Sequence, residues 1–380
     1  MKYAVIGAGL MGSAAAFDLA VNNPDDEVVL ADIDTQRATE TALTIGRNVR
    51  PEELDVNDHE ALIKVLSGAN AAISAVSYTV NYQISRAAID AGVHMCDLGG
   101  NNDTVQQQLT LDSEAKKNGV TIVPNCGLAP GITSVLVMKS IKQFDEIDSI
   151  KIRVGGLPQQ PRPPLNYQVL FGVEGLINEY IERVVVISNG KVASAEPLAD
   201  LEEIQFPEPF DTLEAFNTSG GTSILPQLLE GKVNNLDYKT IRYKGHCEKF
   251  RTLLELGFAS SEPITVGSTV KTMREFFEAL LRKKLDYGGK DVVLARVTTT
   301  GLSKGLSKTL AYEFVDYYDD ATTMTAMMRT TAFPTSIIAQ LLAHGTVQMR
   351  GVLPPELCVP GDIMITELKK RNVNIKQTVT

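Results

Sequence analysis

The fold of this chain is decided near its start by the stretch Lys2-Tyr3-Ala4-Val5-Ile6-Gly7-Ala8-Gly9-Leu10-Met11-Gly12-Ser13-Ala14-Ala15-Ala16-Phe17. It reads as an apolar strand, a glycine-rich turn and an alanine-rich helix. In such a turn Gly7 allows a tight bend, Gly9 lets the backbone approach a pyrophosphate, and Gly12 lets helix and strand pack closely. The phosphates then lie at the helix N-terminus, where free N–H groups favour negative charge. The stretch predicts a dinucleotide-binding turn that includes Leu10 and Met11.

A second apolar strand, 27–31, ends at Asp32, which stands about 20 residues beyond the last glycine of the turn. A carboxylate at this place accepts the 2′-hydroxyl of an unphosphorylated ribose and repels a 2′-phosphate. We therefore expect NAD as the cofactor rather than NADP. Ile33 offers no group to hold a phosphate, whereas Arg37 on the next predicted helix leaves NADP open.

The composition is that of an ordinary globular protein, with 380 residues, 44% apolar and 22% charged. Lys and Arg total 36 against 46 Asp and Glu, so the net charge is -10, and we expect no nucleic-acid partner. No apolar run approaches the roughly 20 residues of a membrane helix, and the chain enters its first strand at once. We expect no signal peptide, no membrane contact and a cytoplasmic protein. The length favours two domains.

The cysteines are scattered and show no ligand spacing, so we expect no metal site and free thiols in a reducing compartment. There are four: Cys96, Cys126, Cys247 and Cys358.

Alternating strands and helices continue after Asp32 and predict a doubly wound, Rossmann-type parallel sheet, an α/β fold. Further along, β-branched and alternating segments predict a second α+β domain with a mixed or antiparallel sheet, and the Gly- and Pro-rich stretch 155–164 predicts a loop. The expected Rossmann helices are 35–45, 58–66, 80–91 and 104–118, its later strands are 71–76, 93–96 and 120–123, and the second domain's strands are 149–154, 184–188, 235–243 and 292–297. We place the Rossmann domain at 1–131, completed by C-terminal helices in 321–380, and the second domain at 132–320.

Ligands of open parallel sheets lie beyond the carboxyl ends of the strands, and three candidate catalytic residues fall there. Tyr78 follows strand 71–76, Asp97 follows strand 93–96, and Cys126 follows strand 120–123. Asp97 has the chemistry to hold an amine substrate and accept its proton. Alternatively, Asp97 caps the turn that follows it, Cys126 is a buried apolar residue, and Tyr78 only packs.

The second domain offers candidate substrate-binding residues. Arg242 and His246 belong to the donor-rich segment Arg242-Tyr243-Lys244-Gly245-His246, where the guanidinium could bind a carboxylate bidentately. Thr218, Gly221 and Thr222 lie in a polar, glycine-rich segment whose hydroxyl and N–H groups suit the same task. A solvated strand edge and a surface turn are the alternatives.

Several segments together resemble the saccharopine dehydrogenase family, across nearly the whole chain. They are the N-terminal turn, Asp97, Cys126-Gly127-Leu128-Ala129-Pro130-Gly131, Arg242 to His246, Thr330-Thr331-Ala332-Phe333 and Gly351-Val352-Leu353-Pro354-Pro355. Within the family, Asp32 makes the chain look most like the lysine 6-dehydrogenases, which oxidise the ε-amine of L-lysine. Ser77 and Lys244 stand where relatives often carry proline.

The resemblance implies that the last helices pack on the Rossmann domain and that the second domain forms a dimer contact. It implies that Tyr78, Asp97 and Cys126 line the substrate pocket. We expect Asp55 and Val56 to lie near the adenine, and Ala75, Val76 and Ser77 near the nicotinamide ribose. The expected reaction is NAD-dependent oxidation of lysine to its 6-semialdehyde with release of ammonia, in a homo-oligomer. An NADP-dependent dehydrogenase of saccharopine or carboxynorspermidine and a non-catalytic NAD sensor are the alternatives.

Overall fold

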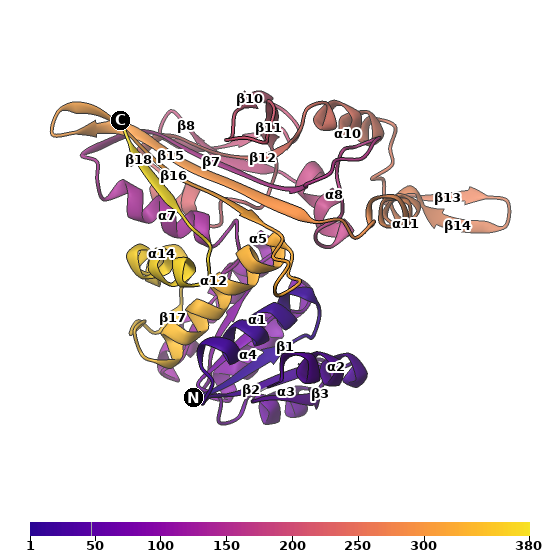
Figure 1. Cartoon of the computed structure of the whole chain (residues 1–380), viewed down its shortest axis with the longest axis vertical. Coiled ribbons are helices and arrows are strands. Elements are labelled where there is room, and N and C mark those ends of the chain that lie inside the picture. Colours follow the sequence, from indigo (N-terminus) through magenta and orange to yellow (C-terminus); the bar gives the residue numbers. More distant parts are fainter. Residues whose placement is uncertain (47) are drawn as a thin grey trace. The chain divides into compact units, whose positions relative to one another are not determined.

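The computed structural model describes residues 1–46 and 48–380, which divide into two compact units (Figure 1). The Rossmann unit holds residues 1–142, 223–225 and 328–375. The sheet unit holds residues 143–222, 226–327 and 376–380.

The Rossmann unit is built on a seven-stranded sheet in the order β17-β6-β5-β4-β1-β2-β3, in which every neighbouring pair is parallel. The predicted doubly wound sheet is therefore confirmed. Its chain reversal beside β1 is where such folds bind dinucleotides. The strands are β1 (Lys2–Ile6), β2 (Glu27–Asp32), β3 (Val49–Glu53), β4 (Ala71–Ser74), β5 (His94–Asp97), β6 (Thr121–Val123) and β17 (Gly351–Val352).

Three helices of this unit begin at side-chain caps. The side chains of Asp34, Asp58 and Asn101 each accept a backbone N–H three residues on, which satisfies free donors of the first turn. The predicted helix 104–118 is two helices, broken at Thr110 and Leu111. The helices are α1 (Leu10–Asn22), α2 (Thr35–Ile45), α3 (His59–Leu66), the 3₁₀ turn η1 (Tyr78–Val80), α4 (Asn81–Asp90), α5 (Asn102–Leu109), α6 (Asp112–Lys117), α7 (Ile132–Ile141), α12 (Ala326–Ala343), α13 (Pro355–Cys358) and α14 (Gly361–Lys370).

The C-terminal helices belong to the Rossmann unit, and α12 lies beside α1 (Figure 1). A buried network ties them: Asp18 of α1 accepts a hydrogen bond from Ser336 of α12 at 2.6 Å and one from Arg371 at 2.7 Å. Asp18 and Arg371 are 2% and 7% exposed, and Arg371 also pairs with Glu367, so the buried carboxylate depends on Arg371 for compensation. This network fixes the returning chain against the first helix of the fold.

The sheet unit carries a nine-stranded sheet whose main path runs β10-β11-β12-β7-β15-β16-β18, with β8 and β9 off that path. Only the β12–β7 pair is parallel among the described pairs, so the predicted mixed sheet is confirmed. Its strands are β7 (Glu146–Pro158), β8 (Val184–Ser188), β9 (Lys191–Ala195), β10 (Glu202–Ile204), β11 (Leu213–Asn217), β12 (Val233–Tyr243), β15 (Asp291–Ser303), β16 (Leu306–Tyr317) and β18 (Lys376–Val379), beside the hairpin β13 (Pro263–Val266) and β14 (Thr269–Thr272). Its helices are α8 (Val173–Ile181), α9 (Leu225–Leu229), α10 (His246–Glu255) and α11 (Met273–Leu285).

The predicted loop 155–164 is wrong over its first residues, because β7 continues to Pro158. A Cβ on Gly155 would meet the Ile241 carbonyl oxygen at 2.6 Å, and one on Gly156 would meet the Met327 side chain at 2.5 Å. These glycines are therefore required by close packing inside a sheet rather than by a turn.

The unit boundaries differ from the predicted domains 1–131 and 132–320. Helix α7 belongs to the Rossmann unit, where it packs against α13 and α14, so that unit runs to residue 142. The last residues, 376–380, leave it again because β18 pairs with β16 of the sheet unit.

Candidate functional site

The three glycines of the first turn have the packing that the sequence predicts. A Cβ on Gly12 would lie 1.8 Å from the Gly7 carbonyl oxygen, and one on Gly7, where φ is +102°, would lie 2.8 Å from the Ala75 carbonyl oxygen. Gly9, the N-cap of α1, has nothing within 4 Å of the same position. Open space therefore lies at the N-terminus of α1, where a pyrophosphate binds in dinucleotide folds.

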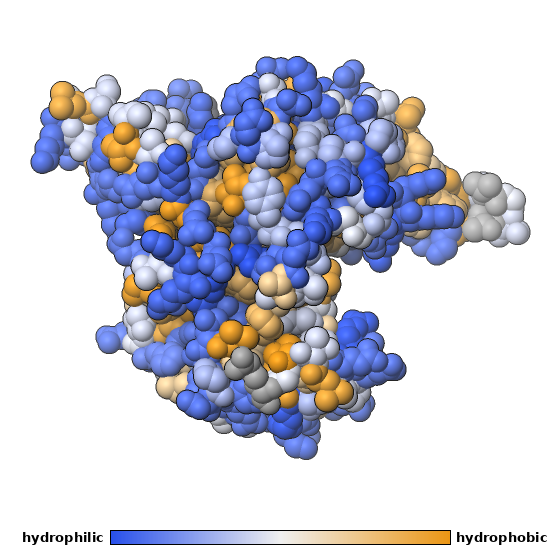
Figure 2. Space-filling model, in the orientation of Figure 1, coloured by the Kyte–Doolittle hydropathy of each residue, from blue (hydrophilic) through white to orange (hydrophobic). Residues whose placement is uncertain are grey.

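Asp32 closes the other side of this turn. Its carboxylate accepts the Ala8 N–H at 2.6 Å and the Asp34 N–H at 2.8 Å. The side chains of Leu10 and Ile33 are 62% and 68% exposed, and apolar side chains gather on the face that carries α1 and α2 (Figure 2). A carboxylate between exposed apolar side chains can accept ribose hydroxyls beside an adenine. The residues thus fit a dinucleotide, and the preference for NAD stays a prediction.

The other predicted cofactor residues lie in turns of the same unit. Asp55 is exposed and accepts two hydrogen bonds from Asn57, while the Val56 carbonyl accepts one from Gln83 at 3.1 Å. Ala75 and Val76 line the glycine turn, since both approach a Cβ placed on Gly7. Ser77 caps the 3₁₀ turn that begins at Tyr78. Met11 is half-buried in the first turn of α1.

Asp97 ends β5 and is completely buried. It accepts the Gly99 N–H at 2.8 Å, the Asn125 N–H at 3.2 Å and the Gln108 Nε2–H at 2.7 Å. Burial raises the pKa of Asp97, and these hydrogen bonds oppose the rise. The carboxylate holds together the turns after β5 and β6, which is the capping alternative that the sequence left open, and no part of it is exposed to a substrate.

Cys126 is also completely buried, and its thiol contacts the Val123 carbonyl oxygen at 3.0 Å. Burial, with the neighbouring Cys96, raises the pKa of the Cys126 thiol well above its usual range. A thiol in this state is unreactive, so the geometry favours a packing role over a catalytic one. Tyr78 is half-buried beside the turn after β5, where a Cβ on Gly100 would lie 3.1 Å from its ring.

In the sheet unit, Arg242 of β12 is 3% exposed. Its Nε donates to the Tyr180 hydroxyl at 2.9 Å, its Nη1 donates to the Ile241 carbonyl at 2.9 Å, and its guanidinium lies 4.7 Å from the Tyr167 ring centroid. Its Nη2 has no hydrogen-bond acceptor among the residues that the structure describes. The two tyrosine rings stabilise the cation, and the guanidinium keeps a donor that can bind an anionic ligand.

His246 completes this arrangement as a neutral ring. Its Nδ1 lies 2.9 Å from the Leu165 carbonyl oxygen, which only a protonated nitrogen can contact favourably, so Nε2 accepts from the Tyr180 hydroxyl at 3.2 Å. Burial and the nearby Arg242 charge lower the pKa of His246 to about 3. His246 therefore orients Tyr180, and through it Arg242, rather than binding a ligand anion.

The predicted loop residues lie on the same face of β12 as Arg242. Successive side chains of a strand point to opposite faces, so residues 238, 240 and 242 share one face of β12. The Thr218 hydroxyl lies 2.6 Å from the Thr240 hydroxyl, and a Cβ on Gly221 would lie 2.3 Å from the Tyr238 ring. Thr222 is 5% exposed. The structure thus brings Thr218, Gly221 and Arg242 together.

Sequence reasoning missed Tyr167, Tyr180 and the neighbouring Glu179. All three come from the segment 165–181, which carries no motif. Glu179 and Tyr180 lie on α8, and Tyr167 lies in the stretch before that helix. The apolar spacing of α8 could have identified Tyr180 as a core residue but not as the partner of Arg242.

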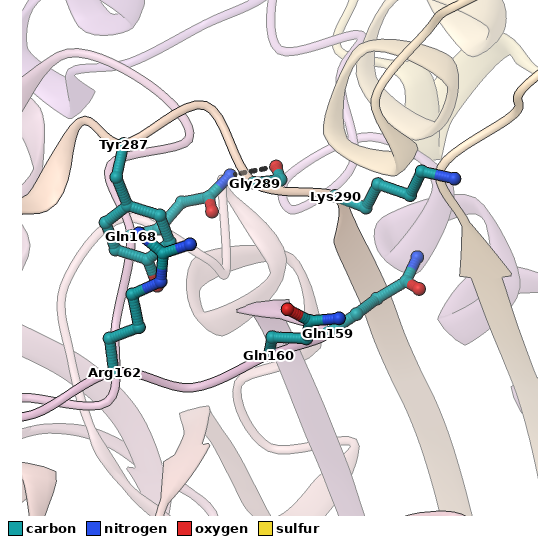
Figure 3. Close-up of a pocket in the computed structure, with 7 residues that line it drawn as sticks. All are labelled: Gln159, Gln160, Arg162, Gln168, Tyr287, Gly289 and Lys290. Carbon is teal, nitrogen blue, oxygen red and sulfur yellow. Dashed lines mark hydrogen bonds between the residues drawn. The ribbon is translucent and has the colours of Figure 1, made fainter.

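A separate cavity of about 180 Å³ in the sheet unit is lined by polar side chains (Figure 3). Gln168 donates to the Gly289 carbonyl at 2.6 Å, while its Oε1 and the Tyr287 hydroxyl are buried without a protein partner. Arg162 stacks on the Tyr287 ring at 4.3 Å. Ordered water satisfies such buried polar atoms. The lining residues are Gln159, Gln160, Arg162, Gln168, Tyr287, Gly289 and Lys290.

The described residues contain neither a candidate metal site nor a candidate membrane span. No group of three or more His, Cys, Asp or Glu side chains in 1–46 and 48–380 is placed to hold a metal ion. No helix in the same ranges is long and apolar enough to cross a membrane.

Comparison with known families agrees with both units. Residues 3–123 match the saccharopine dehydrogenase NADP binding domain, and residues 127–373 match the saccharopine dehydrogenase C-terminal domain. The chain belongs to the saccharopine dehydrogenase family. This confirms the resemblance drawn from the sequence motifs, and it makes the protein a member of an oxidoreductase family with a nicotinamide-dinucleotide domain.

Curated relatives are distant. Alpha-aminoadipic semialdehyde synthase of Arabidopsis thaliana is 26% identical over 298 residues, covering 74% of this chain and 28% of the relative. Saccharopine dehydrogenase (NADP(+), L-glutamate-forming) of Saccharomyces cerevisiae is 22% identical over 435 residues, covering 97% of this chain and 96% of the relative. The chain spans only 28% to 52% of the length of the first relatives it matches.

Solved structures show the same fold. The apo saccharopine dehydrogenase (L-Glu forming) from Saccharomyces cerevisiae has a TM-score of 0.81 at 20% identity, covering 100% of this chain and 99% of that one. The homospermidine synthase from Legionella pneumophila, solved with NAD, has a TM-score of 0.70 at 12% identity, covering 100% and 91%. At these identities the likeness establishes architecture alone.

Proposed function

We propose that this family member oxidises the ε-amine of L-lysine with NAD, forming the 6-semialdehyde and ammonia. The observation that carries the proposal is Arg242, a buried guanidinium held by Tyr180, with Nη2 unpaired among the described residues. Such a group suits a single carboxylate, because a charge-assisted hydrogen bond is strong where water is excluded.

Other arginines of the sheet unit argue against a substrate with more carboxylates. Arg153 is buried, but it is paired with Asp237 and Glu202. Arg251 donates to the Leu198 carbonyl, and Arg162 stacks on Tyr287. Arg242 is thus the buried guanidinium with a donor to spare, which favours lysine over saccharopine, whose extra carboxylates need extra cations.

The cofactor would be held by the turn of Gly7, Gly9 and Gly12 and by Asp32, and it would supply a hydride acceptor. Asp32 favours NAD, because its carboxylate would repel the 2′-phosphate of NADP. The saccharopine dehydrogenases of Pyricularia oryzae and Saccharomyces cerevisiae are named for NADP, so this chain would differ from them.

The chain's own residues bind and orient the substrate. Arg242 holds the α-carboxylate, and the Thr218–Thr222 loop covers the same face of β12. Carbon 6 of the substrate gives up a hydride, water adds to the resulting imine, and ammonia leaves. The aldehyde of the product then condenses with the α-amine of the same molecule. Water is released, and the ring of piperideine-6-carboxylate forms. Overall, lysine, NAD⁺ and water give semialdehyde, NADH, ammonia and one proton.

The first experiment follows the absorbance of reduced nicotinamide while the full chain, with NAD or NADP, is offered L-lysine, saccharopine or carboxynorspermidine at alkaline pH. Turnover of lysine with NAD and release of ammonia is the expected result. Turnover of saccharopine or carboxynorspermidine alone would mean that the enzyme is a secondary-amine dehydrogenase of the same family. NADH binding without any turnover would favour a sensor.

Replacing Asp97 with asparagine should leave turnover within about tenfold of the parent, because a buried, fully hydrogen-bonded carboxylate positions its turns and does not take the substrate proton. Asparagine can still accept the Gly99 and Asn125 N–H groups, and Gln108 has a buried, unpartnered Oε1 to receive the new amide. The measurement is kcat over a pH range with saturating lysine.

Asp103→Asn, at an exposed acid on α5, is the matched control. A fall of more than about 100-fold in a folded Asp97→Asn protein, with loss of the acidic limb of the pH profile, where protonation of a general base lowers the rate, would restore Asp97 as the general base.

A further inference from the structure

A second unpaired charge stands beside Arg242. Glu179 lies on α8 next to Tyr180, and its carboxylate interacts electrostatically with Arg242, Tyr167 and Tyr238. The carboxylate makes no hydrogen bond to any described residue. The residue is half-buried, so its carboxylate has hydrogen-bonding capacity left for a ligand.

Arg242 does not supply the missing partner. Its Nε and Nη1 donate to Tyr180 and to the Ile241 carbonyl, and no hydrogen bond joins it to Glu179. The guanidinium and the carboxylate therefore interact as a cation and an anion, each with unused hydrogen-bonding capacity. The backbone links them to the predicted substrate loop as well, since the Glu179 carbonyl accepts the Ser219 N–H at 2.9 Å.

We propose that Glu179 and Arg242 form a zwitterion site that recognises the α-amino acid end of the substrate. Glu179 accepts hydrogen bonds from the α-ammonium, and Arg242 Nη2 donates to the α-carboxylate. The inference rests on the proposed function for the identity of the substrate. It adds that the enzyme selects an α-amino acid rather than any primary amine.

The electrostatics of Glu179 agree with such a role. Burial raises the pKa of Glu179 to about 7, with Glu182 adding to the rise and Arg242 opposing it. The other ionisable groups of the cluster are neutral at this pH, because burial raises the pKa of Tyr167, Tyr180 and Tyr238 and lowers that of His246. A bound ammonium stabilises ionised Glu179, so lysine should bind more tightly as pH rises from about 6 to 8.

The test compares L-lysine with 6-aminohexanoate, which keeps the ε-amine and the carboxylate but lacks the α-ammonium. Glu179→Gln should lower kcat/KM for lysine about 10- to 100-fold, mainly through KM, because one charge-assisted hydrogen bond is lost. It should leave kcat/KM for 6-aminohexanoate within about threefold, since that substrate never made the contact. The rise in lysine affinity between pH 6 and 8 should disappear. Glu174→Gln, at an exposed position on α8, is the control.

Equal losses for both substrates would overturn the inference, since a merely structural Glu179 predicts them. So would a wild-type enzyme that does not prefer lysine to 6-aminohexanoate. If the wild type turns over no amine, the proposed function fails, and thermal stabilisation by L-lysine decides the inference alone. Stabilisation present in the wild type and absent in Glu179→Gln supports the zwitterion site, and stabilisation absent from both overturns it.

Discussion

Replacing Gly12 with alanine should abolish binding of the nicotinamide dinucleotide and cost about 3 kcal/mol or more in the free energy of unfolding. The added Cβ would stand 1.8 Å from the Gly7 carbonyl oxygen, 2.9 Å from its carbonyl carbon and 3.2 Å from the Ala75 side chain. The first two are backbone atoms of the glycine turn, which cannot swing aside as a flexible side chain would. Helix α1 must therefore shift away from β1, and its N-terminal N–H groups move with it.

Gly9 provides the matched variant, because the two substitutions separate folding from binding. A Cβ on Gly9 meets no protein atom within 4 Å, and its φ of -71° is open to alanine. Gly9→Ala should therefore change the free energy of unfolding by about 1 kcal/mol or less, the range for a glycine N-cap replaced by alanine. The methyl group fills the space that a pyrophosphate needs, so dinucleotide affinity should fall by at least about tenfold.

Gly172, the N-cap of α8, is the control for the cap itself, since it also has nothing within 4 Å. Urea unfolding and titration calorimetry with NADH measure the two quantities. Normal NADH binding by a folded Gly9→Ala protein would show that the open space at α1 does not receive the phosphates.

The parts of the fold that the sequence predicted are those with a local signal. The glycine turn and the strand that ends at Asp32 each depend on a few neighbouring residues, and both lie where expected. The same local reading failed at Gly155 and Gly156, because glycine signals a turn by its freedom of φ but is also used where another backbone approaches closely.

The candidate site was predicted less completely, because its contacts join distant segments. Asp97 was correctly placed at a strand end, but its carboxylate is saturated by Gln108 and Asn125, 11 and 28 residues away. Arg242 was identified from its strand-end segment, whereas Tyr180 lies 62 residues earlier on a helix without a motif. Such pairings follow from how α8 packs on the sheet, and no spacing along the chain encodes them.

His246 should make the sheet unit acid-labile, since the pKa of this ring is about 3 in the native state and 6.5 is its ordinary value. Between these values the unfolded chain binds a proton that the native state does not. The free energy of unfolding therefore rises with pH across this window, by up to about 1.4 kcal/mol per pH unit, and the contribution is complete above pH 6.5. Over the whole window it amounts to on the order of 5 kcal/mol.

Glu179 acts in the opposite direction, so the histidine effect must be isolated by a variant. Burial raises the pKa of Glu179 to about 7, and the native state keeps a proton that the unfolded chain has lost above its ordinary pKa of 4.5. Its contribution to the free energy of unfolding therefore falls as pH rises from 4.5 to 7. Because this slope is common to wild type and His246 variants, it cancels in their difference.

His246→Asn places an amide N–H where Nδ1–H donates to Leu165, but it removes the acceptor for Tyr180 and the ring stacked between Phe216 and Phe250. At pH 8 the variant should be less stable by about 2 to 3 kcal/mol. The difference in the free energy of unfolding should shrink as pH falls toward 4. Only the wild type has a histidine here that takes up a proton when the chain unfolds, and this proton uptake lowers its stability in acid. Urea unfolding at a series of pH values gives both curves, with the exposed His344→Asn as the histidine control.

Parallel curves for wild type and His246→Asn would contradict a neutral buried ring. Convergent curves would mean that the hydrogen bonds from Leu165 through Tyr180 to Arg242 require an unprotonated His246, so acid should weaken carboxylate binding before it unfolds the chain.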